Sequence, residues 1–515
     1  MDNYGNYWRV SQSAMNTDIL ISNAKSLSPE LSLAGLGLVI IILDLIVSRK
    51  SILQTVSLLG LAIPAILSVF LWNELGNPDS ETPANVFGTL AIDKFSLFFK
   101  FLILVILALV IMSSGSFLNK LNRFKGEYYA LLIFSATGMM LLASTTELIS
   151  IYVSLELTAL PLVALAAFGR DSRSTESGIK LLILSAISSA ILLYGMVLVY
   201  GLSGTTHISE IAGGLVGNVD SGIAFGSYGL MLGIIMIIAG FGFKIASVPF
   251  HMWVPDVYEG APSPITAYLS VASKAAGFAV ILRLFYVAFD NQSQDWSTVF
   301  AILAAVSMSL GNLVAINQAS VKRMLAYSTI AHAGYLMVGL AAVVTQIPEG
   351  SDLVYIGPGS ILFYLVAYAV TNLAAFFAII AITSHTGSEL IRDLAGMGRR
   401  SPLIALILAI ALISLTGIPP TAGFMGKLFI FSAAVSSGML WLVIIGVVNS
   451  VISAYYYLRI IRFMYMSEPS SEEKISSSTI PLTAMVIVTV GVIGLGVLPQ
   501  PLFDLSSSVV SILSP

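Results

Sequence analysis

The chain has 515 residues, of which 57% are hydrophobic and only 10% are charged, and its formal net charge is −3. Its mean hydropathy of +0.93 excludes a soluble globular protein and indicates a polytopic membrane protein. The absence of cysteine excludes disulfides, thiolate catalysis and cysteine-ligated iron–sulfur clusters in this chain. The four histidines are too dispersed in the sequence to indicate a metal site. The sequence has no Lys/Arg-rich run of the kind that indicates nucleic-acid binding.

The apolar segments predict an all-α membrane protein. The first 28 residues do not resemble a cleaved signal peptide, so we expect the first helix to remain. At roughly 20 apolar residues for each span, the sequence accommodates about fourteen transmembrane helices. Their continuous apolar runs disfavour the alternating strands of a β-barrel. The expected helices begin near Pro29, Ser51, Phe95, Gly126, Glu147, Glu176, Tyr228, Pro264, Ser297, Val321, Gly359, Pro402, Met439 and Ile480.

Basic residues predict the orientation of these helices. Lys and Arg in short loops stay preferentially in the cytoplasm, and most of them here lie in alternate loops. The opposite side carries Arg9, Lys25, Lys94 and Lys100 together with acidic loops, so we expect both termini outside the cytoplasm. Arg283, in the eighth helix, is expected to extend its charged end to the membrane surface. The cytoplasmic set is Arg49, Lys50, Lys120, Arg123, Lys125, Arg170, Arg173, Lys180, Lys322, Arg323, Arg392, Arg399, Arg400, Arg459, Arg462 and Lys474.

Four charged residues lie deep inside the apolar segments: Glu156, Lys244, Lys274 and Lys427. A charged side chain at the bilayer centre costs on the order of 2.5–3.5 kcal/mol, so it faces a polar interior and marks an ion or proton path. The alternative is a set of ion pairs that only fix helix packing. The abundant Phe, Tyr and Met residues are expected to be ordinary helix-packing material.

Two of the helices are predicted to be broken. The run Gly240–Pro249 carries Lys244 and meets a proline, and Ser414–Pro420 ends in two prolines before Lys427. Proline removes a backbone donor and interrupts a helix, and the freed backbone groups need protein or water around them. Broken helices at membrane depth are typical of ion sites in transporters.

The sequence contains neither nucleotide-binding motif that would supply energy directly. No G-x-G-x-x-G follows a strand, and Gly426-Lys427 is followed by Leu428 rather than Ser or Thr. If the protein moves ions uphill, another subunit or another gradient must therefore supply the energy.

These features together carry a family resemblance. The runs Gly242–Pro262 (GFKIASVPFHMWVPDVYEGAP) and Lys322–Ser328 (KRMLAYS), followed by His332, resemble the antiporter-like membrane subunits of respiratory complex I. Gly417–Pro420 (GIPP) and Gly423–Lys427 (GFMGK) extend the match. The resemblance implies two inverted five-helix repeats. It divides the chain into N-terminal helices 1–3 (1–125), a first repeat (126–292), a second repeat (293–466) and a C-terminal helix 14 (467–515).

Within this family the chain resembles subunit 2, the N-type. Lys427 stands where the M-type subunit has Glu, and the chain stops soon after the fourteenth helix, without the long lateral helix of the L-type. Gly387–Gly396 (GSELIRDLAG) and Ser450–Arg459 (SVISAYYYLR) are most similar to the cyanobacterial and chloroplast form of the complex.

The resemblance also implies roles for individual residues. Glu156 would pair with Lys244, Lys274 would connect the two halves, and Lys427 would end the second half-channel. His332 and His251 could bridge these groups through water, because histidine changes charge near neutral pH; each could equally be a satisfied interior histidine. Glu176 and Lys180, four residues apart, fit either an access path or a surface i,i+4 pair.

The function implied is proton translocation within a complex I-type NAD(P)H- or ferredoxin-dependent quinone oxidoreductase. No redox cofactor or metal is expected in this chain; quinone, as plastoquinone, and iron–sulfur clusters would belong to partner subunits. The expected partners are neighbouring antiporter-like and small membrane subunits, lipids and, indirectly, the peripheral redox arm, in a thylakoid membrane with lumenal termini. The alternatives are a subunit of a multisubunit cation/proton antiporter, a structural scaffold with a silent relay and, with least support, a small-solute permease.

Overall fold

The structure, a computed structural model, describes residues 17–48, 50–76, 85–121, 124–219, 224–343, 356–469, 474–475 and 479–513. The N-terminal elements are α1 (Thr17–Ser26), α2 (Ser28–Ile46), α3 (Ser51–Gly60), α4 (Ala62–Glu74), the antiparallel strands β1 (Asn85–Val86) and β2 (Leu90–Ala91), and α5 (Lys94–Leu121). They are followed by α6 (Lys125–Ser144), α7 (Leu148–Ala166), α8 (Ser172–Ser203), α9 (Ile208–Val219), α10 (Ala224–Ile245), α11 (Trp253–Gly260), α12 (Ser263–Arg283) and the π-helical turn η2 (Leu284–Ala288).

The second half of the chain is again helical. It contains η3 (Asp290–Gln292), α13 (Ser293–Ala315), α14 (Val321–Ala341), α15 (Ile356–Thr386), η5 (Ile391–Leu394), α16 (Met397–Arg400), α17 (Pro402–Thr416), α18 (Ala422–Ser436) and α19 (Leu440–Met466). The chain closes with α20 (Thr479–Val497), α21 (Gln500–Val510) and η6 (Ser511–Leu513).

The predicted number of transmembrane helices is confirmed. Among the described residues, 13 helical spans are long and apolar enough to cross a membrane, α3 and α4 forming one of them, and the shorter apolar helices α17 and α18 together make a fourteenth, broken span. Each expected helix starts within about four residues of its predicted position, the usual scatter of helix boundaries. The short hairpin β1–β2 and the short helices α9 and α21 were not expected from the sequence.

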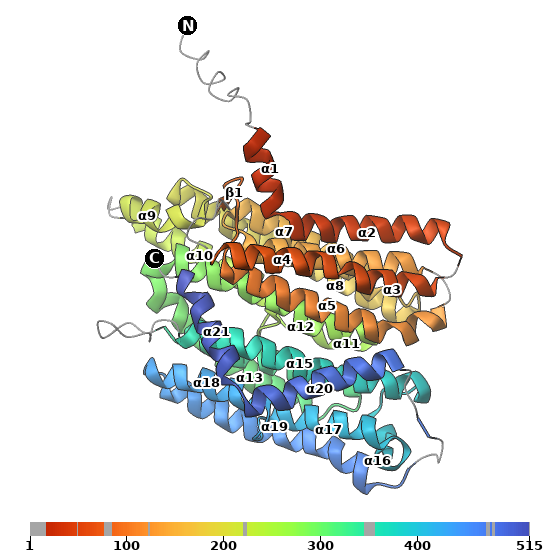
Figure 1. The fold of residues 1–515 in the computed structure, drawn as a ribbon. Coiled ribbons are helices and arrows are strands. Elements are labelled where there is room, and N and C mark those ends of the chain that lie inside the picture. The colour runs from red at the N-terminus through yellow and green to blue at the C-terminus, as the bar shows by residue number, and fades with distance from the viewer. Residues whose placement is uncertain are drawn as a thin grey trace.

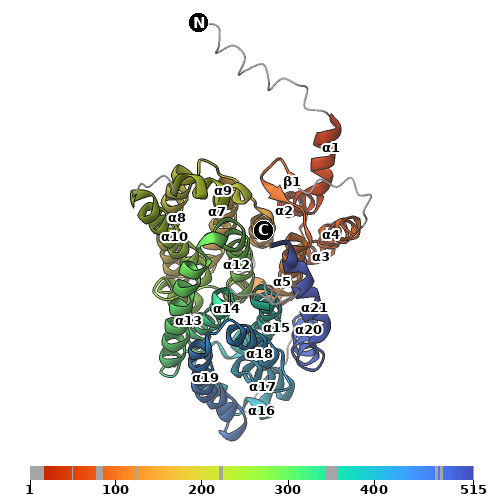
Figure 2. The ribbon, with the colours of Figure 1, turned by 90° about the vertical axis from the view of Figure 1, so that its left-hand side faces the viewer.

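The spans lie side by side and run in roughly the same direction, from left to right in Figure 1. The end view shows α12, α14 and α15 enclosed by the other helices (Figure 2), and the apolar window of α12 is completely buried. Small residues on α12 permit this close packing, as is usual where helices associate inside a membrane. At Gly277, for example, an added Cβ would lie only 3.1 Å from the side chain of Ile245 on α10.

Two charged residues of the N-terminal helices form a fully buried ion pair. The sequence analysis placed Lys100 among the loop residues on the side opposite the cytoplasm, but in the structure this residue is buried on α5. Its Nζ lies 2.6 Å from Oε1 of Glu30 on α2. The pair therefore ties the first transmembrane helix to the third inside the bundle.

Arg283 has a partner that the sequence did not predict. Its guanidinium is buried within the protein at the end of α12 and binds Asp93 through two bonds, Nη1–Oδ2 at 2.8 Å and Nη2–Oδ1 at 3.1 Å. The bidentate geometry, which matches a carboxylate to a guanidinium, stabilises an arginine where a lone charge would not be tolerated.

Replacing Lys100 with Met should destabilise the protein, because it leaves Glu30 buried without a counter-charge. Breaking one side of a buried pair costs about 3–5 kcal/mol, whereas replacing both partners by apolar residues is often neutral. We expect the melting temperature of the purified assembly to fall in Lys100→Met and to recover in the double variant Glu30→Leu/Lys100→Met. Equal melting of wild type and the single variant would contradict this role.

Candidate functional site

The first candidate region is the break in the seventh span. Helix α10 ends at Ile245 and α11 begins at Trp253, as the proline predicted. Ala246 takes a left-handed backbone conformation, φ 65°, and the Val248–Pro249 peptide bond is cis. Side chains hydrogen-bond the backbone groups that the break frees. The Ser307 hydroxyl on α13 accepts a hydrogen bond of 2.9 Å from the Val248 amide, and the Trp253 indole donates one of 3.0 Å to the Phe243 carbonyl. The break is therefore a defined structure that fixes the end of α10.

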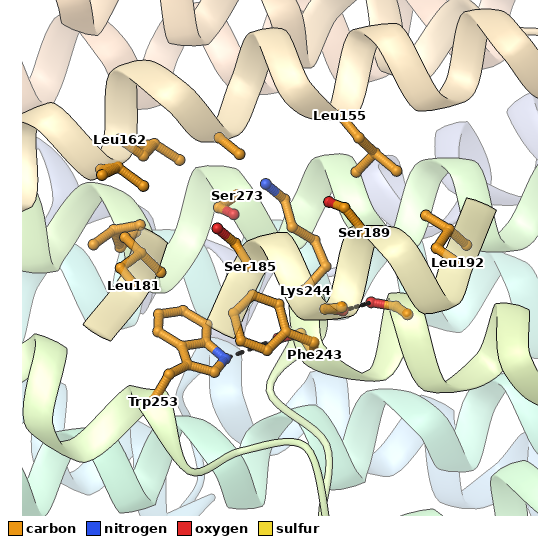
Figure 3. A pocket seen from close by; sticks show the side chains of 15 residues that line it. Leu155, Leu162, Leu181, Ser185, Ser189, Leu192, Phe243, Lys244, Trp253 and Ser273 are labelled. Atoms are coloured by element: carbon orange, nitrogen blue, oxygen red, sulfur yellow. Dashed lines mark hydrogen bonds between the residues drawn. The ribbon is translucent and has the colours of Figure 1, made fainter. Parts of the chain in front are cut away.

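Lys244, in the last turn of α10, lies in a cavity beside this break. The cavity has an empty volume of about 550 Å³ and is bounded by α7, α8, α10, α11 and α12. Its polar lining includes Ser185, Ser189 and Ser273, and the Lys244 ammonium points into the space between Ser189 and Ser273 (Figure 3). In the described part of the chain Lys244 has no hydrogen bond or ion pair shorter than 4.0 Å, so its charge faces the cavity. The part of this space that the centre of a water molecule can occupy is about 50 Å³, which is enough for a few waters beside the hydroxyl groups of the wall.

Glu156 lies on the α7 side of the same cavity. Its Oε1 accepts a hydrogen bond of 2.5 Å from Ser189, which lines the cavity, and its charge is close enough to act on Lys244. The two residues do not form a direct ion pair in this structure. The geometry therefore brings Glu156 and Lys244 together electrostatically, with Ser189 bonded to the carboxylate.

Lys274, next to Ser273 on the buried helix α12, faces the second half of the protein. Its side chain is almost completely buried and Nζ donates a 2.5 Å hydrogen bond to the carbonyl of Thr329 on α14. The Thr329 hydroxyl in turn accepts from Tyr368 on α15 at 3.0 Å. Two adjacent residues of α12 thus touch the Lys244 cavity on one side and α14 on the other.

His332 lies one turn further along α14, enclosed by aromatic rings. Its Nδ1 is hydrogen-bonded to the Tyr364 hydroxyl at 2.6 Å, and Nε2 lies 3.5 Å from the Tyr457 hydroxyl. The ring also packs against Tyr368 and Tyr335, with centroids 5.1 and 5.6 Å away. Because both ring nitrogens have a hydroxyl partner, His332 can donate from one and accept on the other.

The second break, in the twelfth span, is closed by Lys427. Helix α17 ends at Thr416 and Gly417 takes a φ of 91°, which favours glycine; the Lys427 stem passes 3.0 Å from the position a Cβ would occupy there. Lys427, on α18, donates to the carbonyls of Leu415 at 3.1 Å and Thr416 at 2.9 Å. The last carbonyls of a helix lack helical partners and carry partial negative charge, so a buried ammonium is well placed there.

Tyr335 and Ser450 complete the path between His332 and Lys427. Lys427 also donates to the Ser450 hydroxyl at 3.2 Å, and Ser450 donates to Tyr335 at 3.2 Å. The Lys427 ammonium lies 4.4 Å from the centre of the Tyr335 ring. Hydrogen bonds and ring contacts therefore connect Lys274 to Lys427 through His332, without leaving the interior.

The sequence analysis assigned the tyrosines of this region to packing and did not predict the hydroxyl contacts that four of them also make. Their hydroxyls are all used: Tyr335, Tyr364, Tyr368 and Tyr457 contact His332 or its hydrogen-bonded neighbours. A signal was present, since Tyr335 stands three residues after His332, and Tyr364 and Tyr368 are four apart on one helix face.

His251 differs from His332. It is buried at the break of the seventh span, and its Nδ1 has no hydrogen-bond partner in the structure. Within the described ranges it makes no hydrogen bond to Lys244, Lys274 or His332, so its bridging role stays a prediction. Across the same ranges, no group of three His, Asp or Glu side chains is arranged to hold a metal ion.

A cluster of charged residues holds α11 at one end of the bundle. Glu176 and Lys180 form the expected i,i+4 pair, 2.7 Å apart, but Lys180 also binds Asp256 on α11 at 2.8 Å. Arg323 on α14 binds Asp256 at 3.0 Å and Glu259 at 2.9 Å. The α11 ion-pair cluster consists of Arg173, Glu176, Lys180, Asp256, Glu259 and Arg323. Since Leu181 and Trp253 line the Lys244 cavity, the cluster fixes two of its walls.

Two broken helices, each with a buried lysine at its break, and buried polar groups between them are features typical of membrane proteins that transfer ions or protons. Residues 145–453 match the family described as NADH:quinone oxidoreductase/Mrp antiporter, transmembrane, and the chain belongs to this family.

Individual relatives agree with this membership. NADH-quinone oxidoreductase subunit N of Dehalococcoides mccartyi is 45% identical over 482 residues, 93% of this chain and 97% of the relative. NAD(P)H-quinone oxidoreductase subunit 2 of Gloeobacter violaceus is 40% identical over 505 residues, 96% of this chain and 94% of the relative. A chain of respiratory complex I from Thermus thermophilus with bound aureothin has 30% identity and a TM-score of 0.74, covering 93% of this chain and 99% of its own.

Asp256 should give the α11 ion-pair cluster a defined pH dependence. It lies outside the apolar spans; burial alone would raise the pKa of its carboxyl, but the contacts with Lys180 and Arg323 outweigh burial and hold the pKa below its usual value. The stabilisation is therefore present above about pH 4, the ordinary Asp range, and is lost as the pH falls through the lower folded-state value.

We expect Asp256→Asn to melt at a lower temperature than wild type at pH 7, with the difference narrowing in acid. Melting curves of the purified assembly from pH 7 downwards measure this. The control is Asp504→Asn, which removes an exposed carboxylate bonded to Gln500. The stabilising role of the cluster would be refuted if wild type and Asp256→Asn melted at the same temperature at pH 7. It would also be refuted if the difference between their melting temperatures grew in acid.

Proposed function

We propose that this chain is the N-type, proton-translocating membrane subunit of a complex I-type quinone oxidoreductase, and that Glu156, Lys244, Lys274, His332 and Lys427 form its proton path. The observation that carries the proposal is the series of buried hydrogen bonds and ring contacts from Lys274 to Lys427, in a family whose relatives include NADH-quinone oxidoreductase subunit N. None of Lys244, Lys274 and Lys427 forms an ion pair within 4.0 Å in the described part of the chain; they are bonded to carbonyls and a hydroxyl or face a cavity, so no direct counter-charge holds them in the charged form.

The path works by transfer of charge between neighbouring groups. A change of charge at Glu156 acts on Lys244 across the cavity, and Coulomb interactions in a protein interior are several times stronger than in water. His332 lies close enough to both Lys274 and Lys427 for their charges to act on it. With a hydroxyl at each ring nitrogen, it can take a proton on one side and release one on the other. Moving one proton against 100 mV costs about 2.3 kcal/mol, which the redox reaction must supply.

The redox chemistry itself belongs to other subunits in this proposal. Quinone and iron–sulfur clusters would lie in partner chains, and the partners in the membrane would be further antiporter-like and small subunits. The finer assignment to a thylakoid complex using plastoquinone rests on the resemblance to the cyanobacterial form alone. The Gloeobacter relative, 40% identical, is named an NAD(P)H-quinone oxidoreductase subunit, and the Dehalococcoides relative is 45% identical.

The termini are proposed to lie outside the cytoplasm. The bundle end that carries α16 and its arginines lies opposite the end where the chain terminates (Figure 1). Basic loops stay preferentially inside, which supports this orientation.

A cation/proton antiporter is the second candidate, because the family description itself includes the Mrp antiporters. Such a protein could use the same lysines without redox input. Purification and transport assays distinguish the two functions. A complex I subunit copurifies with a quinone-reducing activity whose turnover drives proton uptake. An antiporter subunit instead moves protons in response to an imposed cation gradient.

Lys427→Met should uncouple proton transfer from quinone reduction. The change removes the ammonium that bonds two helix-end carbonyls and Ser450, and a barrier increase of about 1.4 kcal/mol already slows transfer tenfold. We expect at least that loss in proton pumping, measured in membrane vesicles against electrons transferred, with the complex assembled at normal abundance.

The matched control is Lys474→Met, which removes an exposed lysine between α19 and α20. It should pump like wild type. An assembled Lys427→Met complex with the wild-type proton yield would exclude Lys427 from the path and favour the scaffold interpretation.

A further inference from the structure

An apolar groove runs along the outside of the N-terminal helices, away from the proton path. It lies between α4 and α21 and has an empty volume of about 960 Å³. Helix α5, which contacts both α4 and α21, forms its floor, and both views place α21 beside α5 (Figures 1 and 2). Val69, Val105 and Leu505 line the groove and are each more than a third exposed, so the groove opens to the surroundings of the bundle.

A polar pocket lies directly beyond one end of this groove. The pocket has an empty volume of about 1250 Å³, and the same three elements line both cavities. Along α4 the lining continues from Trp72 to Leu75, and along α5 from Phe98 to Lys94. Each step is three or four residues, about one helical turn or 5 Å.

The described lining of the pocket carries one charge without an opposite partner. Arg283 and Asp93 both line it and neutralise each other through their bidentate pair. Lys94 is exposed and has no ion-pair partner among the described residues. Asn85 and Ser508 add polar groups to the lining. The Asp504 carboxylate of α21 is bonded to Gln500 and does not line the pocket.

The residues lining the groove favour acyl chains over a helix of another subunit. Helix interfaces within membranes are enriched in Gly, Ala, Ser and Thr, which allow close approach of the backbones. None of the described residues lining this groove is of these types; they are branched aliphatic or aromatic, and Trp72 packs edge-on against Phe101 at 6.1 Å. Trp72 stands nearest the polar pocket on α4, where a tryptophan is typical of the membrane interface.

We propose that the groove between α4, α5 and α21 binds an anionic phospholipid, with its acyl chains against Phe98, Phe101 and Val105 and its phosphate beside Lys94. The surface along these three elements changes from apolar to positively charged and polar. A phospholipid has the same order of parts, because its acyl chains are followed by its phosphate and polar headgroup. The bound lipid fills the gap between the first three transmembrane helices and the C-terminal helix α21, and so links the two ends of the chain.

The test uses the intact complex, stripped of lipid and exchanged into phosphatidylglycerol or phosphatidylcholine, with bound lipids counted by native mass spectrometry. Val105→Trp fills the groove and should retain one phosphatidylglycerol fewer than wild type. Lys94→Gln should keep the lipid but lose about fivefold of the preference for phosphatidylglycerol, the equivalent of about 1 kcal/mol for one lysine near a lipid phosphate.

Matched controls are available on the same chain. Val306→Trp enlarges an exposed valine on α13 outside both cavities, and Lys474→Gln removes an exposed lysine elsewhere; both should bind lipid like wild type. The proposal is overturned if Val105→Trp and Val306→Trp retain equal numbers of lipids, or if Lys94→Gln keeps the full preference. A photo-crosslinking residue at position 105 should label lipid, and labelling of a neighbouring subunit instead would assign the groove to a protein interface.

Discussion

The structure depends on one constraint, that every backbone polar group inside the hydrocarbon region must find a partner in the protein or line a water-filled cavity. Two spans are broken, and each break exposes backbone groups that an intact helix would satisfy. At the first break Ser307 and the Trp253 indole supply the missing partners, and at the second Lys427 supplies them itself by bonding the carbonyls of Leu415 and Thr416. The charge at the second break is therefore part of what closes the broken helix.

The two halves of the protein meet this constraint differently. Lys244 faces a cavity with hydroxyl-bearing walls and has Glu156 within electrostatic reach, whereas Lys427 is held by two carbonyls, a hydroxyl and the ring of Tyr335. Loss of the proton from Lys427 would weaken the bonds that close the second break. In the proposed proton path, protonation and local geometry would therefore be coupled at Lys427, whereas Lys244 has no hydrogen bond in the described structure that loss of its proton would break. Lys274, buried between them, joins the two environments.

The sequence was sufficient for the spans, because continuous apolar runs and alternating basic loops follow from the membrane itself. It also located the four charged residues and both breaks, since lysine and proline inside apolar segments stand out. The ion pair of Arg283 was not predicted because its partner, Asp93, is 190 positions away and no local pattern pairs them. The tyrosines around His332 were likewise missed: a hydroxyl is inconspicuous in a chain with 20 tyrosines until the fold shows which ones converge.

The most direct test of the account is the number of protons moved per electron in a complex carrying Lys274→Met. This residue lies between the Lys244 cavity and the His332 path, and its one hydrogen bond in the described structure goes to the Thr329 carbonyl, so the substitution removes the connection with little change in volume. The account predicts an assembled complex whose proton yield falls while quinone reduction continues or slows with it. An assembled complex with the full proton yield would show that the two halves do not communicate through Lys274, and would contradict the account.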